Sequence, residues 1–342
     1  MPSETVDFGR RNEPPRAEPA DLPSTTRSAG MNPLRILAKR ALMGVATAWV
    51  VLTAVFGLFT LTQDWVLQGQ IGAARFAGEN DPEVLAEIRA EYFAARGLDR
   101  PLTEVYADYL GRMVTLEWGT SLGGDAVFPL VTDAVVRTAT YVLPALVIAV
   151  AVGVGVGTYA ALNPDGRLAS GGIGAAYLLF ALPNFWIGGL LYSRTLGDST
   201  AASPLLYDHL LPIAFAAATL LGGYVSYSRA HSREYASADF VSLVRAKGAS
   251  DRRVAAHVLR NAAIPFFSML FTEALGLLVL ATFVIEVLFG IEGFGLLLLD
   301  AVENRDLPVL LGGTVVIIWV GVIGNVVQDL AYGYLDPRVD IG

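Results

Sequence analysis

Six long runs of apolar residues, nearly free of charge, constrain this chain more than any other feature. A chain inside hydrocarbon has to satisfy its own backbone hydrogen bonds, so each run is predicted to be a helix. At about 1.5 Å of rise per residue, roughly 20 residues cross the apolar core of a bilayer. We therefore expect an all-α polytopic membrane protein. Its predicted transmembrane helices are Ala41–Leu61, Thr138–Leu162, Leu168–Ser193, Leu210–Ser228, Ala262–Phe289 and Leu307–Gln328.

Composition supports the membrane assignment and excludes several functions. Hydrophobic residues make up 54% of the chain and charged residues only 16%, a combination that soluble domains rarely show. Cysteine is absent, so the chain has no disulfide and no thiolate chemistry. The net charge of −8 argues against nucleic acid as a partner. Acidic loops combined with few lysines fit either a host adapted to high salt or an arginine-biased genome.

The sequence predicts no catalytic, cofactor or metal site. The three histidines are scattered, without the spacing of a metal site. No GxxxxGK[ST] loop is present to bind nucleotide phosphates. The glycines of Val152–Gly157 lie in an uncharged run and indicate close helix packing. If the chain takes part in an ATP-driven process, another polypeptide has to bind the nucleotide.

The basic residues predict the orientation, because cytoplasmic loops gather Lys and Arg. With both termini in the cytoplasm, every strongly basic short segment lies inside. The inner segments are then the tail with Lys39 and Arg40, the turn Asn163–Arg167, the loop Arg229–Arg260 and the tail with Arg338. The outer segments are Gln63–Asp133, Arg194–His209 and Gly290–Asp306.

This orientation divides the chain into five parts. In order, they are a disordered cytoplasmic tail (1–33), the first transmembrane helix (34–62), an extracellular helical insertion (63–133), a core domain with five transmembrane helices and a cytoplasmic loop at 229–262 (134–332), and a cytoplasmic C-terminal tail (333–342). Within the insertion, Pro82–Arg96 and Pro101–Met113 have helical periodicity, and Gly97 is predicted to end the first of these helices.

The most informative polar segment is the basic loop between the fourth and fifth transmembrane helices. Seven Lys and Arg residues lie between Arg229 and Arg260. Charge alone favours a loop that only fixes orientation. The residue order favours a helix presented to a protein partner. Ser250 is placed to cap that helix with its hydroxyl, Asp251 suits the positive N-terminal end, and Gly248 permits a tight turn before it.

Part of this basic loop matches a known pattern, carried by Arg245-Ala246-Lys247-Gly248, then His257-Val258-Leu259-Arg260-Asn261-Ala262, then Pro265. In this order, the residues resemble the cytoplasmic signature loop of ATP-binding-cassette importer permeases. The dipeptide/oligopeptide/nickel branch is the most similar. Further matches run in order along the chain and include Gly97–Leu102, Glu117–Ser121, Leu182–Phe185, Glu286–Phe289, Asp306–Pro308 and Leu335–Arg338. Thr62–Ala77 departs from the branch, because it lacks a Pro-Gly-Asp-Pro-like segment after the first transmembrane helix.

The resemblance implies the type I importer permease fold with six transmembrane helices, in the plasma membrane. It implies four kinds of partner: a second homologous permease subunit, two cytoplasmic ATPases, an extracellular substrate-binding protein and the bilayer. A short helix around Gly248–His257 would dock on an ATPase. The coupling-loop residues are Arg245, Ala246, Lys247, Gly248, Ala249, Ser250, Arg252, Arg253, His257, Arg260 and Asn261.

Two acidic residues of the fifth transmembrane helix are further candidates. Glu273 is either a group in the translocation path or a hydrogen-bonded structural residue. Glu286 lies near the outer end and is predicted to order an outer gate loop. Peptides are the favoured substrate, with sugars or nickel chelates as alternatives. A secondary transporter is a weaker alternative, since it would need ion-coupling groups near the midplane and often shows internal repeats.

Overall fold

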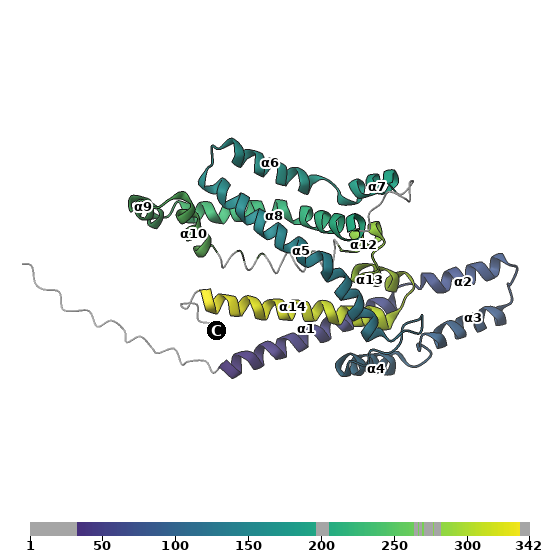
Figure 1. Ribbon diagram of the computed structural model, residues 1–342. Coiled ribbons are helices and arrows are strands. Elements are labelled where there is room, and N and C mark those ends of the chain that lie inside the picture. The colour runs from purple at the N-terminus through teal and green to yellow at the C-terminus, as the bar shows by residue number, and fades with distance from the viewer. Residues whose placement is uncertain are drawn as a thin grey trace, which may run out of the picture. The chain divides into compact units, whose positions relative to one another are not determined.

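The computed structural model describes residues 33–195, 205–262 and 282–335, together with positions 266, 269 and 276 (Figure 1). Across these residues the regular elements are helices, apart from one isolated bridge between Thr120 and Ala126. The predicted all-α class is confirmed. The helices are α1 (Pro33–Leu61), α2 (Trp65–Phe76), α3 (Pro82–Ala95), α4 (Leu102–Thr115), α5 (Val127–Leu162), α6 (Arg167–Ala181), α7 (Asn184–Thr195), η1 (Leu205–Leu210), α8 (Leu211–Ala236), α9 (Asp239–Ala246), α10 (Asp251–Asn261), α12 (Thr282–Phe289), α13 (Phe294–Glu303) and α14 (Leu307–Leu335).

Four helical stretches of the described residues are long and apolar enough to cross a membrane. They contain the first, second, fourth and sixth predicted runs. A fifth candidate is the bent pair α12 and α13, whose axes differ by 90°. Most of the predicted fifth run lies outside the described residues. The four stretches are Ala41–Phe76, Val127–Leu162, Leu205–Ala236 and Leu307–Gln328.

The run predicted as the third transmembrane helix forms two helices. α6 ends at Ala181, Leu182 is extended, and α7 begins at Asn184. The cause is Pro183, which disfavours a helical conformation in the residue before it and lacks a backbone N–H. Pro212 likewise stands in the first turn of α8, where proline is tolerated.

α5 is the central helix of the region after residue 44, and it packs along α8 (Figure 1). Its 36 residues correspond to about 54 Å, well beyond the hydrocarbon thickness. It begins at Val127, before the predicted Thr138, so the expected boundary between insertion and core falls inside this helix. Its first turns pack with α4, α13 and α14 in one apolar cluster.

Glycine lets α5 and α8 approach closely, as the sequence predicted. A side chain at Gly153 would overlap Tyr224, and one at Gly157 would overlap Ser228 and the backbone of Val225. The predicted close packing of these glycines is therefore confirmed. Small residues allow this approach because neighbouring backbones need no room for side chains.

The predicted insertion contains three helices where the sequence indicated two. α3 and α4 match the two periodic segments, and Gly97 follows α3 with a φ of 62°, as a helix stop requires. The unexpected helix is α2. Asp64 caps it by accepting a hydrogen bond from the Leu67 N–H at 3.0 Å. Leu67 and Ile71 pack on Tyr92 of α3.

Candidate functional site

The basic loop folds into an elbow, which we define as α9, the turn Lys247–Ser250 and α10. The elbow is amphipathic. Three of its four valines are buried, namely Val241, Val254 and Val258, and the last two lie one helical turn apart on α10. They pack against the C-terminal end of α5 at Leu162 and the end of α8 at Tyr235. The apolar side of the elbow is therefore fixed to the two central helices.

The turn between α9 and α10 needs its glycine. Gly248 has a φ of 77°, which residues with a side chain rarely adopt. Its N–H donates to the Arg245 carbonyl at 2.9 Å, and the Ala249 N–H donates to the Val244 carbonyl at 3.3 Å. These bonds end α9 and redirect the chain into α10. The tight turn predicted at Gly248 is confirmed.

The predicted hydroxyl cap of α10 is wrong. Ser250 does occupy the N-cap position with extended backbone, but its side chain makes no capping hydrogen bond. Ser250 and the residues of the first turn, Asp251 to Arg253, are exposed. Water can therefore satisfy the free N–H groups of this helix end, and the hydroxyl is not required.

The charged side chains of the elbow lie on its solvent side. No acidic side chain of the described residues is within ion-pair distance of Arg252 or Arg253, whereas His257 has an interaction partner. Ala249 is half-buried, and the side chain of Asn261 lies outside the description. The exposed predicted residues are Arg245, Ala246, Lys247, Gly248, Ser250, Arg252, Arg253, His257 and Arg260. The elbow thus exposes five basic side chains, those of Arg245, Lys247, Arg252, Arg253 and Arg260.

Glu286, the predicted gate residue, is fully buried on α12. Its Oε1 accepts hydrogen bonds from Thr138 Oγ1 at 2.5 Å and Tyr141 OH at 3.0 Å, both on α5. Its Oε2 accepts from the Leu296 N–H of α13 at 2.7 Å. Thr138 Oγ1 in turn accepts from the Phe294 N–H at 2.7 Å. One carboxylate therefore connects α5, α12 and α13 across the 90° bend.

The bend leaves no space beside this carboxylate. A side chain at Gly293 would overlap both the Glu286 carboxyl group and Thr138. Gly290, which follows α12, has a φ of 64°. The hydrogen bonds support the predicted ordering of the loop by Glu286, while its role as a gate stays a prediction. In the sequence, Glu286 was indicated only by the family match at Glu286–Phe289. That match gave no indication of Thr138 as the partner.

Glu286→Ala is expected to lower the free energy of unfolding by about 2–3 kcal/mol, because it leaves three buried hydrogen-bond donors without their acceptor. Thermal unfolding of the detergent-solubilised protein measures the loss. The matched control is Glu292→Ala, since that side chain is 80% exposed and pairs only with Arg137 at the surface. Equal melting temperatures for the two variants would contradict the assignment.

A second buried polar cluster, not foreseen from the sequence, connects the predicted insertion to the turn between α13 and α14. Arg305 is 4% exposed, and its Nε lies 3.0 Å from Asp64 Oδ2. Tyr92 OH donates to the same carboxylate at 2.8 Å. Burial and this hydrogen bond raise the pKa of Tyr92 to about 12, so the phenol stays protonated as a donor. The guanidinium of Arg305 also stacks on Phe59 and Trp65.

Glu273 lies outside the residues that the structure describes, so its two interpretations stay open. The described histidines His209, His231 and His257 belong to three different helices, and the described residues contain no group of acidic and histidine side chains that could hold a metal ion. The arrangement that remains is an elbow with exposed basic side chains at one end of α5 and α8, and the buried carboxylate of Glu286, which is bound by residues farther along α5.

Comparison with known proteins places this geometry in context. Residues 153–341, which include the elbow and Glu286, match the family described as binding-protein-dependent transport system inner membrane component. The oligopeptide transport system permease protein AppB of Bacillus subtilis is 29% identical over 280 residues, covering 76% of this chain and 87% of that protein. The dipeptide transport system permease protein DppB of the same organism is 30% identical over 302 residues, covering 86% and 96%. A putative peptide permease protein of Brucella ovis is 32% identical over 328 residues, covering 90% and 99%.

Proposed function

This chain belongs to the family of binding-protein-dependent transport system inner membrane components, and we propose that it forms half of the translocation path of an ATP-driven peptide importer. Peptide is the proposed substrate because relatives that align over most of this chain carry dipeptide or oligopeptide in their names. The second half would be a homologous permease subunit. The multi-pass chain would lie in the inner membrane with both termini in the cytoplasm.

The elbow is the observation that carries this proposal. Its buried valines hold it on α5 and α8, and its exposed arginines face solvent. A surface of this kind suits a partner with acidic groups around a groove that receives a short helix. Two cytoplasmic ATPases would bind two such elbows. Their closure on ATP would draw the elbows together and rock the attached helices between inward- and outward-facing states.

Purification of the affinity-tagged chain from its native membranes tests the assembly. We expect a second permease-like subunit, ATPase subunits and an extracellular substrate-binding protein to co-purify, each identified by mass spectrometry. Recovery of the chain without any ATPase, from membranes that support uptake, would overturn the proposal. Binding of peptides, oligosaccharides and nickel chelates to the recovered binding protein would then identify the substrate class.

Arg252→Glu combined with Arg253→Glu is expected to reduce ATPase co-purification about tenfold, because a change of about 1.4 kcal/mol in binding corresponds to that factor. Both side chains are exposed, so the substitutions leave the buried valines intact. The control is Arg167→Glu, an exposed arginine on the predicted cytoplasmic turn between α5 and α6. If the control variant co-purifies with as little ATPase as the double variant does, the net charge of the chain determines ATPase binding, and the elbow does not.

A further inference from the structure

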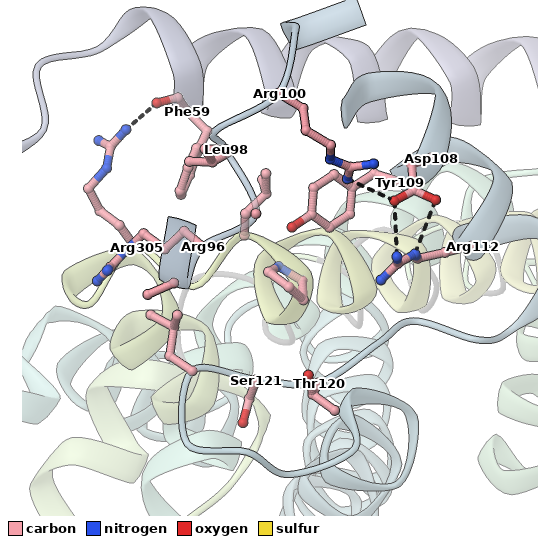
Figure 2. A pocket seen from close by; sticks show the side chains of 15 residues that line it. Phe59, Arg96, Leu98, Arg100, Asp108, Tyr109, Arg112, Thr120, Ser121 and Arg305 are labelled. Atoms are coloured by element: carbon pink, nitrogen blue, oxygen red, sulfur yellow. Dashed lines mark hydrogen bonds and ion pairs between the residues drawn. The ribbon is translucent and has the colours of Figure 1, made fainter. Parts of the chain in front are cut away.

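A cavity rich in arginine lies in the predicted outer part of the chain, beside Arg305 of the second polar cluster and separate from the elbow and Glu286. Its volume is about 200 Å³, several times the roughly 30 Å³ that a water molecule occupies in the liquid. Its wall is formed by the end of α3, one side of α4, the segment between α4 and α5, and the start of α14 (Figure 2). Its polar lining residues are Arg96, Arg100, Asp108, Tyr109, Arg112, Thr120, Ser121 and Arg305.

The charges around this cavity do not balance. Arg305 is neutralised by Asp64 at 3.0 Å. The nearby Asp306 is occupied by the backbone N–H groups of Leu122 and Val309. Asp108 is the one acidic residue among those that line the cavity, and the remaining lining arginines are Arg96, Arg100 and Arg112. When Asp306 is included, three guanidinium groups lie near two carboxylates, which leaves one positive charge in excess.

Asp108 is shared between two of these arginines, as Figure 2 shows. Its Oδ2 lies 3.2 Å from Arg100 Nη2 and 3.0 Å from Arg112 Nη2. Hydrogen bonding from Arg100, followed by the charge of Arg112, lowers the pKa of Asp108, so the carboxylate stays ionised. Each of the two guanidinium groups has several N–H donors, and the one carboxylate that they share cannot accept hydrogen bonds from all of them.

Arg96 has unused hydrogen-bonding capacity as well. Its guanidinium stacks on Tyr92 at 3.7 Å, and its Nη2 reaches the Asn304 carbonyl only at 3.4 Å. Its Nε is buried and has no hydrogen-bond partner among the described residues. A buried donor without a partner costs free energy, so a ligand that supplies an acceptor would be favoured here.

The other two arginines, Arg100 and Arg112, are accessible to a group from outside the chain. The side chains of Arg100 and Arg112 are 46% and 45% exposed, and Asp108 between them is 35% exposed. Guanidinium forks match a carboxylate by paired hydrogen bonds. The cavity therefore has the shape, the charge and the free donors for one carboxylate that enters from outside the chain.

We propose that this cavity receives an aspartate or glutamate side chain of the extracellular substrate-binding protein. The inference rests on the proposed function, which places the cavity on the face that such a protein approaches. A protein side chain fits better than a free anion, since exposed rim arginines act mainly by steering and orienting a large partner. In this arrangement Asp108 is an internal competitor that occupies the arginines until the incoming carboxylate arrives.

The competitor role predicts opposite effects of two neighbouring substitutions. Arg100→Gln should weaken binding of the substrate-binding protein about fivefold, and Asp108→Asn should strengthen it about threefold, magnitudes typical of rim charges. Damage to the fold would weaken binding in both variants. The control is Arg89→Gln, an exposed arginine of α3 that does not line the cavity. It should leave the affinity unchanged.

The measurement uses the tagged transporter complex in nanodiscs and the binding protein that co-purifies with it, with surface plasmon resonance at low and high salt. Opposite shifts that shrink at high salt support the proposal. Equal shifts, or none, while the complex still binds its binding protein and imports substrate, overturn this inference and leave the proposed function intact. If no binding protein co-purifies, the proposed function itself fails.

Sodium glutarate distinguishes the source of the carboxylate. Under the proposal, glutarate alone does not raise the melting temperature of the complex, whereas the binding protein does. If glutarate stabilises the complex, if Arg100→Gln abolishes that stabilisation and if the affinity for the binding protein is unchanged, the cavity binds small carboxylates. That outcome overturns the assignment to a protein partner.

Discussion

Gly248→Asp is expected to lower uptake about tenfold or more while the protein still reaches the membrane and the ATPases still hydrolyse ATP. Two effects combine in this variant. The φ of 77° at Gly248 costs a residue with a side chain about 1–2 kcal/mol, and the new carboxylate stands inside the basic surface of the elbow. No neighbouring atom lies within 4 Å of a Cβ added at this position, so overlap at the Cβ is not the cause. Uptake of labelled substrate and ATP hydrolysis in proteoliposomes give the two rates.

Gly248→Asn separates charge from backbone strain. Asparagine has nearly the shape of aspartate, is neutral and tolerates a left-handed conformation. We expect it to keep most of the uptake, whereas Gly248→Val should lose uptake through strain alone, because a β-branched residue tolerates this conformation least. Normal uptake by the aspartate variant would contradict a coupling role for the elbow.

Arg305→Gln is expected to lower the free energy of unfolding by about 3 kcal/mol, the largest stability effect that the structure predicts. Removing one partner of a buried ion pair leaves the other charge without compensation, and such losses are typically about 3–5 kcal/mol. The low end applies because Asp64 is 15% exposed and keeps the hydrogen bond from Tyr92. The variant also loses the contacts of the guanidinium with Phe59 and Trp65. Thermal unfolding in detergent measures the change.

Two further variants show whether the buried pair is the cause. Arg112→Gln removes an exposed ion pair and should cost under about 1 kcal/mol. Asp64→Asn combined with Arg305→Gln should cost less than the sum of the two single variants, since contacting residues are not additive. Additive costs would show that Arg305 and Asp64 stabilise the protein independently.

Periodicity and local chemistry predicted most of the helices. The close packing of the glycines on α5, though not the identity of α8 as their partner, the stop at Gly97 and the turn at Gly248 followed from properties of single residues. The break at Pro183 also had a local cause. Each of these features depends on a few neighbouring positions, so the sequence alone was sufficient to predict it.

The features that the sequence did not predict depend on distant residues. Thr138 meets Glu286 only because α5 and α12 pack together, and Asp64 meets Arg305 only because α2 lies near the turn before α14. Neither pair has a spacing that a pattern could show. The hydroxyl cap at Ser250 failed for another reason, because exposure to water removes the need for it. Long-range polar contacts are therefore the part of this site that required the structure.

The attachment of the elbow to α5 determines how far a push on it can travel. Leu162, which the valines of the elbow touch, and Thr138, which binds Glu286, stand on one continuous helix, about 36 Å apart by helical rise. The glycine contacts hold α5 in close packing with α8 along part of this length. A displacement of the elbow would thus reach the bend between α12 and α13 along one helix, which carries Pro144 between the two contacts.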